Sequence, residues 1–254
     1  MFKVYWGTAI FAALTLFSFQ NCSKKTFNQD PDNDVYYSCH EELTKITTPV
    51  KLLFVIDISG SNNPYEGNTD PNKEVRGDSI QEFFDQYKQY SNFSWGIHVF
   101  AGNKASTLIG NNSSPEFTNS INTMQNAIDY FFDLADKGNT PYRHALALAH
   151  KAIQQDSTYT SETKYVVVFL SDGAPNPHVA DATLQSDIND LLSIRPDQIS
   201  FNTIYYGDLS EETADRLEMM ADVGKGQFLD TNTNSTGKYF EISHIVNVPG
   251  VKCN

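Results

Sequence analysis

The sequence is short of positive charge. Its 254 residues include 18 lysines and arginines against 31 aspartates and glutamates, and its formal net charge is -13 at pH 7. Proteins that bind nucleic acid use Lys and Arg to neutralise phosphates, so a nucleic-acid-binding function is disfavoured. An acidic balance of this size is typical of a solvated acidic surface and, more specifically, of sites for divalent cations.

The signatures of common enzyme classes are also missing. No Gly-x-Ser-x-Gly elbow precedes a helix, no His-Glu-x-x-His occurs, and there is no glycine-rich phosphate loop. Asp57 could be the nucleophile of a phosphatase, but that class usually has a second aspartate two positions later, where this chain has Ser59. We therefore do not expect an enzyme, and a metal-dependent hydrolase stays open as an alternative.

The first 21 residues are typical of a signal peptide. Lys3 is their only charged residue, and residues 4–19 are mostly apolar. This length fits a signal peptide better than a spanning helix, with a short membrane anchor as the alternative. Cys22 follows at once, and its placement resembles the cleavage site of bacterial lipoproteins, in which this cysteine carries the lipid. Asn21 before Cys22 departs from the usual small residue of that site.

The polar stretch after Cys22 predicts a tether. We expect residues 22–48 to be a lipidated N-terminus with a flexible linker. The protein would then be exported to the cell envelope and held at a membrane by lipid alone. Ser23 stands where an aspartate would argue against the outer membrane, so we expect an outer-membrane lipoprotein.

Strand and helix patterns alternate from residue 49 onward. Period-two and continuous apolar runs predict strands at 51–56, 94–100, 106–109, 165–170, 200–206 and 226–229. Apolar residues three and four apart predict helices at 79–90, 121–134, 142–155, 182–194 and 211–223, and more weakly at 242–248. Residues 62–78, dense in Asn, Pro, Gly and charge, are expected to form a surface loop. The alternation favours an α/β fold with a doubly wound, mostly parallel sheet flanked by helices.

One polar pattern stands at the end of the first predicted strand. Asp57, Ser59 and Ser61 follow the apolar run 52–56 at every second position. Open α/β folds place ligand sites at the carboxyl ends of their strands. Carboxylate and hydroxyl oxygens suit Mg²⁺, Mn²⁺ or Ca²⁺ and do not suit zinc. The alternative is a strand followed by an ordinary turn, in which Ser and Asp are also common.

Two further pieces of the chain belong to the same predicted edge. Asp172 and Gly173 follow another apolar strand, and Thr140 precedes Pro141 as the expected N-cap of a helix. Because parallel strands end at one edge of their sheet, these side chains can converge on one ion. The set consists of Asp57, Ser59, Ser61, Thr140 and Asp172.

This set resembles the metal-ion-dependent adhesion site of von Willebrand factor type A (VWA) domains. That site combines Asp-x-Ser-x-Ser, a Thr before a later helix, and an Asp usually followed by Gly. The resemblance covers about residues 49–248 in the family's order of strands and helices, with Ser171 where many members have Thr and an insertion at residues 62–78. It implies Mg²⁺, or Mn²⁺ or Ca²⁺, with a position open to a Glu or Asp of a protein partner. A structural module of an envelope assembly is the alternative.

The insertion, residues 62–78, leaves the same strand end as Asp57. We expect its polar and aromatic side chains to make complementary contacts and to set partner specificity, with a passive surface insertion as the alternative. These residues are Tyr65, Glu66, Asp70, Lys73, Glu74 and Arg76.

The remaining cysteines, Cys39 and Cys253, are an even pair in an oxidising setting if the chain is exported. Cys253 stands in the short tail 249–254, and the two cysteines bracket a domain whose termini the VWA resemblance brings close together. We expect a disulfide between them, worth at most roughly 5 kcal/mol on the chain-entropy view. Two unrelated free thiols are the alternative.

Overall fold

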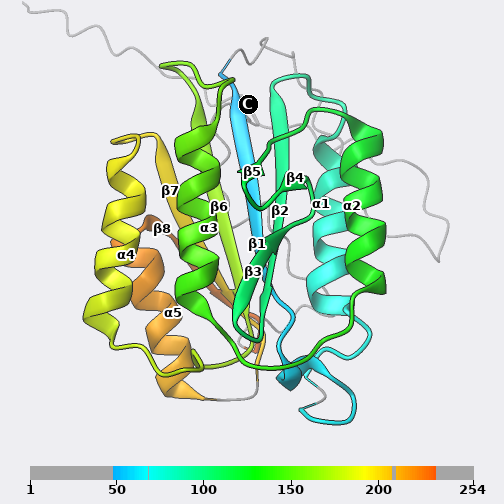
Figure 1. Ribbon diagram of the computed structural model, residues 1–254, viewed down its shortest axis with the longest axis vertical. Helices are drawn as coiled ribbons and strands as arrows, with labels where there is room; N and C mark the ends of the chain where they lie inside the picture. The colour runs from blue at the N-terminus through cyan, green and yellow to red at the C-terminus, as the bar shows by residue number, and fades with distance from the viewer. Residues whose placement is uncertain (1–47, 68, 208–209, 233–254) are drawn as a thin grey trace, which may run out of the picture. The chain divides into compact units, whose positions relative to one another are not determined.

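The computed structural model describes residues 48–67, 69–207 and 210–232 (Figure 1). The predictions for the signal peptide, Cys22, the tether, Cys39, Cys253 and the helix at 242–248 fall outside these residues. Within the described ranges every expected strand and helix is present, with bounds shifted by at most three residues. The structure adds a small hairpin of β4 (Gly110–Asn111) and β5 (Ser114–Pro115).

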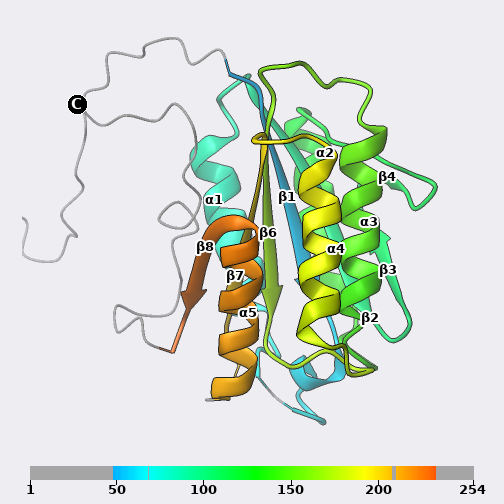
Figure 2. The same cartoon turned by 90° about the vertical axis from the view of Figure 1, so that its left-hand side faces the viewer.

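The main sheet has six strands in the order β3-β2-β1-β6-β7-β8. Each neighbouring pair is parallel except β2 and β3, which are antiparallel. Figure 2 shows the arrowheads of β6 and β8 pointing to the same edge. The strands are β1 (Val50–Asp57), β2 (Phe93–Ala101), β3 (Lys104–Thr107), β6 (Lys164–Ser171), β7 (Ile199–Tyr205) and β8 (Lys225–Asp230).

The strand order reverses at β1. The chain passes from β1 to β2 on one side and later returns to β6 on the other side. Open α/β folds bind ligands at such a switch point, outside the carboxyl ends of the strands. The structure thus confirms the doubly wound, mostly parallel fold and marks the ends of β1 and β6 as the natural place for a site.

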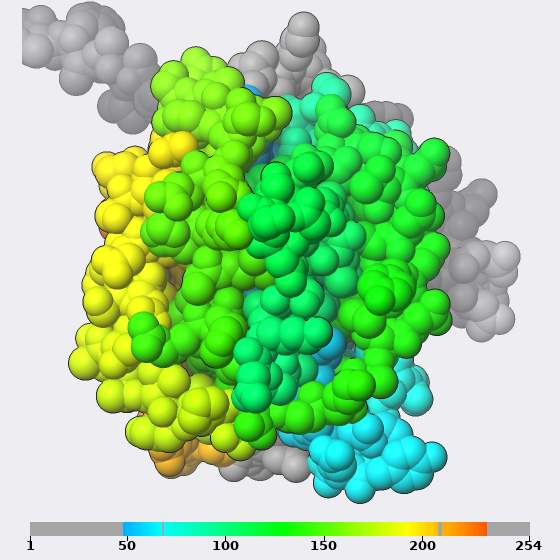
Figure 3. Space-filling model, viewed as in Figure 1, coloured from blue at the N-terminus to red at the C-terminus, as the bar shows by residue number. Residues whose placement is uncertain are grey.

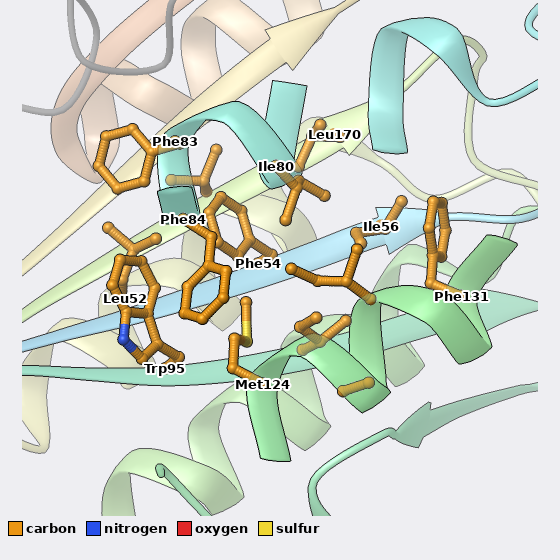
Figure 4. Close-up of a cluster of buried hydrophobic side chains, with 14 of the residues drawn as sticks. Leu52, Phe54, Ile56, Ile80, Phe83, Phe84, Trp95, Met124, Phe131 and Leu170 are labelled. Atoms are coloured by element: carbon orange, nitrogen blue, oxygen red, sulfur yellow. The ribbon is translucent and has the colours of Figure 1, made fainter. Parts of the chain in front are cut away.

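Helices cover both faces of the sheet, which explains why all eight residues of β1 are buried. On one face, Phe54 and Ile56 pack in a cluster with Phe84, Met124 and Phe131 of α1 and α2 (Figure 4). On the other face, Leu53 and Val55 belong to a cluster with α3, α4 and α5. The helices are α1 (Ser79–Tyr87), α2 (Ile121–Asp133), α3 (Tyr142–Gln155), α4 (Asp181–Ser193) and α5 (Glu211–Val223).

None of the helices in the described ranges is long and apolar enough to span a membrane.

The insertion differs from the expected surface loop. It continues from a 3-10 turn, η1 (Gly60–Asn62), and ends in a π-helical turn, η2 (Glu74–Asp78), that leads into α1. It projects from the lower edge of the molecule in Figures 1 and 3. Asp70, Lys73 and Arg76 are buried in it, so the prediction that they face a partner was wrong. Of the expected contact residues, Tyr65, Glu66 and Glu74 are exposed.

Candidate metal centre

The structure brings four of the five predicted site residues together. The Ser61 hydroxyl donates a 2.8 Å hydrogen bond to Asp172 Oδ1, although 111 positions separate the two residues. The Ser59 and Ser61 hydroxyl oxygens lie 3.1 Å apart. The Ser59 amide donates to Asp57 Oδ1 at 2.8 Å, an Asx turn that holds the loop at the end of β1. A continuous row of oxygens therefore runs from β1 to the end of β6.

Thr140, the fifth residue, is positioned by main-chain contacts of its loop, residues 134–140. The Gly60 amide donates to the Gly138 carbonyl at 2.9 Å, and the Lys137 amide donates to the Ile58 carbonyl at 2.9 Å. These bonds fix the Thr140 loop against the loop that carries Ser59 and Ser61. Within the described residues no hydrogen bond joins Thr140 itself to the other four.

The predicted N-cap at Thr140 was wrong. Helix α3 begins at Tyr142, Pro141 is the N-cap residue, and no side chain caps the helix. The amide and carbonyl of Thr140 instead pair with the main chain of Asn176, at 3.1 and 3.0 Å. Its side chain, 7% exposed, is therefore not engaged as a helix cap.

Sequence reasoning did not assign a role to Ser171, the last residue of β6. Its hydroxyl donates a 2.6 Å hydrogen bond to Asp57 Oδ2. Together with the Ser59 amide on Oδ1, this bond holds both oxygens of a fully buried carboxylate. The signals in the sequence are that Ser171 directly precedes Asp172 at the end of an apolar strand and that it stands where many VWA members have Thr.

The two carboxylates make the site electrostatically unfavourable without a cation. Burial, and after it the negative charge of Asp172, raise the pKa of Asp57 to about 7, against the lowering effect of hydrogen bonds from Ser171 and Ser59. Burial also raises the pKa of Asp172, against the lowering effect of its bond from Ser61. Two carboxyl groups that resist ionisation side by side are stabilised in their charged form by a nearby cation.

The arrangement fits a hard divalent cation. Asp172 Oδ2 is buried without a hydrogen-bond partner in the part of the chain that the structure describes. Neighbouring ligands of an octahedral Mg²⁺ at 2.0–2.1 Å stand about 2.9 Å apart, close to the spacing of the two serine hydroxyls. No cluster of three or more His, Cys, Asp and Glu side chains suited to a metal occurs in the described residues. A site here therefore depends on hydroxyl ligands with only two carboxylates.

The comparison with protein families agrees with this geometry. Residues 52–174 match the model of the von Willebrand factor type A domain family. The chain contains a VWA domain. A search of the curated proteins gives no match.

Solved structures share the VWA fold at low sequence identity. The SpRpn10 VWA domain is 13% identical with a TM-score of 0.53, over 72% of this chain and 87% of that one. The pilus adhesin SpaC from Lactobacillus rhamnosus GG is 11% identical with a TM-score of 0.51, over 72% of this chain and 28% of that one. The manganese-loaded TRAP protein of Plasmodium vivax is 17% identical with a TM-score of 0.51, over 74% of this chain and 71% of that one. At these identities the likeness shows the fold alone.

Proposed function

We propose that this VWA domain binds an acidic residue of a protein partner through a divalent cation, Mg²⁺ or Mn²⁺, at the edge of the sheet. The observation that carries the proposal is the row of polar groups between Asp57 and Asp172. The Ser59 amide donates to Asp57, the Ser59 hydroxyl lies against the Ser61 hydroxyl, and the Ser61 hydroxyl donates to Asp172. Ser59, Ser61 and Thr140 would hold the ion directly, and Asp57 and Asp172 would support it through hydrogen bonds and water.

The chemistry of the donor set explains why such a site binds a partner. When bound, the ion supplies a Lewis-acidic centre that takes a carboxylate oxygen from outside. Neutral hydroxyls as direct ligands leave much of a 2+ charge uncompensated. Asp57 is engaged by hydrogen bonds from Ser59 and Ser171, and Asp172 accepts from Ser61 through Oδ1 alone. An acidic side chain on a partner is the complementary group.

The surface around the site supports a protein ligand. Tyr65, a residue of the insertion, is 95% exposed, and exposed aromatic side chains are frequent anchors of protein interfaces. The insertion contacts the candidate site through its main chain, because the Thr69 amide donates to the Ser61 carbonyl at 3.1 Å. A single carboxylate on a partner cannot distinguish one partner from another, so we assign partner specificity to the insertion.

The family and its structural neighbours support a binding role over a catalytic one. VWA domains are in general interaction modules, and the neighbours with this fold include a protein named as a pilus adhesin and one that is manganese-loaded. Export to the envelope, lipidation of Cys22 and the Cys39–Cys253 disulfide are part of the proposal on sequence grounds.

Calorimetric titration of chelator-treated protein with MnCl₂ tests the site. We expect saturable binding in the wild type and its loss in Ser61→Ala, which removes one hydroxyl and no charge. Ser186→Ala, an exposed serine of α4, is the matched control and should bind as the wild type does. Binding of Mn²⁺ by Ser61→Ala with wild-type affinity would refute the assignment.

Capture of a partner is tested separately. Once a ligand is found, its binding in Mg²⁺ and in EDTA should differ, and binding equal in both would contradict the proposed mechanism. Tyr65→Ala should change which ligands bind while leaving Mn²⁺ affinity as it is.

A further inference from the structure

The side chain of Arg76 is fully buried, and its guanidinium contacts the end of β1. It donates through Nε to Asp70 Oδ2 at 2.8 Å and through Nη2 to the Asp70 carbonyl at 2.8 Å. It donates to both carboxylate oxygens of Asp136, at 2.8 and 3.1 Å. Its remaining N–H, on Nη1, donates to the main-chain carbonyl of Asp57 at 2.7 Å. All five N–H donors of this arginine are therefore used.

These bonds join three separate segments of the chain. Asp70 and Arg76 belong to the insertion, Asp57 ends β1, and Asp136 lies in the loop 134–140 that carries Thr140. Arg76 thus connects the strand end that carries Asp57, one of the predicted site residues, to the loop that carries Thr140, another of them. A planar group with donors in fixed directions sets the relative position of such partners more strictly than a single charge does.

Other side chains of the insertion reinforce the same connection. Lys73 Nζ donates to the carbonyls of Phe132 and Leu134, at 3.0 and 2.6 Å. Asn63 Nδ2 donates to the Asp136 carbonyl at 2.9 Å. The insertion is therefore held to the segment that leads to Thr140 by three of its side chains.

The charges in this cluster balance without a metal. Arg76 and Lys73 are opposed by Asp70 and Asp136, with Lys73 Nζ 4.0 Å from Asp136. Burial of such a cluster has a desolvation cost that often equals its Coulomb gain, so stability alone is a weak reason for it. The best-attested use of buried ion pairs is to specify one arrangement among several.

We infer that Arg76 is a positioning residue of the metal site, which fixes the Thr140 loop against the end of β1. The inference rests on the proposed function, because it assigns the arginine to the geometry of that site. Mg²⁺ and Mn²⁺ sites need their oxygen ligands in near-octahedral positions, so a shift of the Thr140 loop lowers the affinity for the ion.

The test compares two matched substitutions in buried ion pairs. Asp136→Asn weakens the bridge from Arg76 to the Thr140 loop. Asp156→Asn makes the same change in the buried Lys51–Asp156 pair, near the opposite end of β1. Both variants are titrated with MnCl₂ at a temperature at which circular dichroism shows them fully folded. We expect roughly a 10-fold or larger loss of affinity in Asp136→Asn and wild-type affinity in Asp156→Asn. Equal affinities in the two variants would overturn the inference.

A second measurement does not depend on the metal. Hydrogen exchange of the chelator-treated proteins reports on the Gly60 and Lys137 amides, which bond across the two loops. Both amides should lose protection in Asp136→Asn and keep it in Asp156→Asn. If the wild type binds no Mn²⁺, the proposed function fails, while these amides still decide whether Arg76 positions the loop.

If Asp136→Asn does not fold, Arg76→Lys takes its place. Lysine keeps the positive charge but cannot donate in the fixed directions that reach all three segments. The Gly60 and Lys137 amides should again exchange faster than in the wild type, and unchanged protection of both would refute the positioning role.

Discussion

Ser171 Oγ lies 2.6 Å from Asp57 Oδ2, so the last residues of two neighbouring parallel strands are linked through their side chains. This bond favours the ionised form of Asp57 and holds Oδ2, while the Ser59 amide holds Oδ1. Ser171→Ala should therefore weaken Mn²⁺ binding and cost about 1–3 kcal/mol of unfolding free energy, since a buried acceptor loses its donor. Ser171→Thr keeps the hydroxyl and serves as the control. Calorimetry and urea unfolding measure the two effects, and an Ala variant as tight and stable as the Thr variant would contradict this role.

Thr140→Val separates metal binding from helix capping. The substitution removes the hydroxyl and keeps the shape of the side chain. Because Thr140 does not cap α3, the unfolding free energy should fall by less than the roughly 1 kcal/mol of a lost N-cap, while Mn²⁺ affinity falls. A loss of about 1 kcal/mol in urea unfolding, as expected for a lost N-cap, together with unchanged Mn²⁺ binding would show that the hydroxyl serves the helix.

Gly67 of the insertion packs closely on the main chain of Ser61. A Cβ there would stand 2.2 Å from the Ser61 carbonyl oxygen and 2.5 Å from the Ser61 Cα, which are main-chain atoms that cannot rotate away. Gly67→Ala should therefore lower the unfolding free energy by about 1–3 kcal/mol and weaken Mn²⁺ binding. Gly173→Ala is the matched control, because a Cβ at Gly173 meets nothing within 4 Å. Thermal unfolding of the two variants measures the difference, and Gly67→Ala should have the lower melting temperature. Equal melting temperatures would refute the close packing.

His98 on β2 should make the protein sensitive to acid. It is 1% exposed, and both ring nitrogens lack hydrogen-bond partners among the described residues. Burial lowers its pKa from 6.5 to about 3. The unfolded chain therefore takes up a proton below pH 6.5 that the folded protein does not accept until about pH 3. The stability that depends on neutral His98 is complete above pH 6.5 and is lost as the pH falls toward 3.

The size of this loss can be measured by urea unfolding at two pH values. Between pH 6.5 and pH 5 the wild type should lose about 2 kcal/mol through His98. In His98→Phe the loss over the same interval should be smaller by that amount. His144→Phe replaces an exposed histidine of α3 and should leave the pH dependence as it is in the wild type. Identical acid sensitivity in His98→Phe and the wild type would exclude His98 as the cause.

Local patterns in the sequence were sufficient for the helices and strands and for placing four of the five candidate side chains next to one another. The apolar run before Asp57 predicts a buried strand, and the structure buries all of β1. Apolar spacing predicts a helix at residues 142–155, the bounds that α3 has. Such patterns depend on which face of an element is apolar, and neighbouring residues are enough to reveal this. The convergence of Asp57 and Asp172 followed from one further rule, that parallel strands end at a common edge.

Only the tertiary structure shows that charged residues of the insertion are buried. Its run of Asn, Pro, Gly and charged residues is typical of a solvated loop, because an isolated Arg or Asp is rarely buried. Arg76 is buried because Asp136, which lies 60 positions away, completes its hydrogen bonds, and no local spacing encodes that pairing. The prediction that Thr140 caps α3 was wrong for a related reason, because the amide and carbonyl of this residue pair with Asn176 on another loop. Burial of charge depends on partners brought by the fold, whereas burial of apolar surface can be read along the chain.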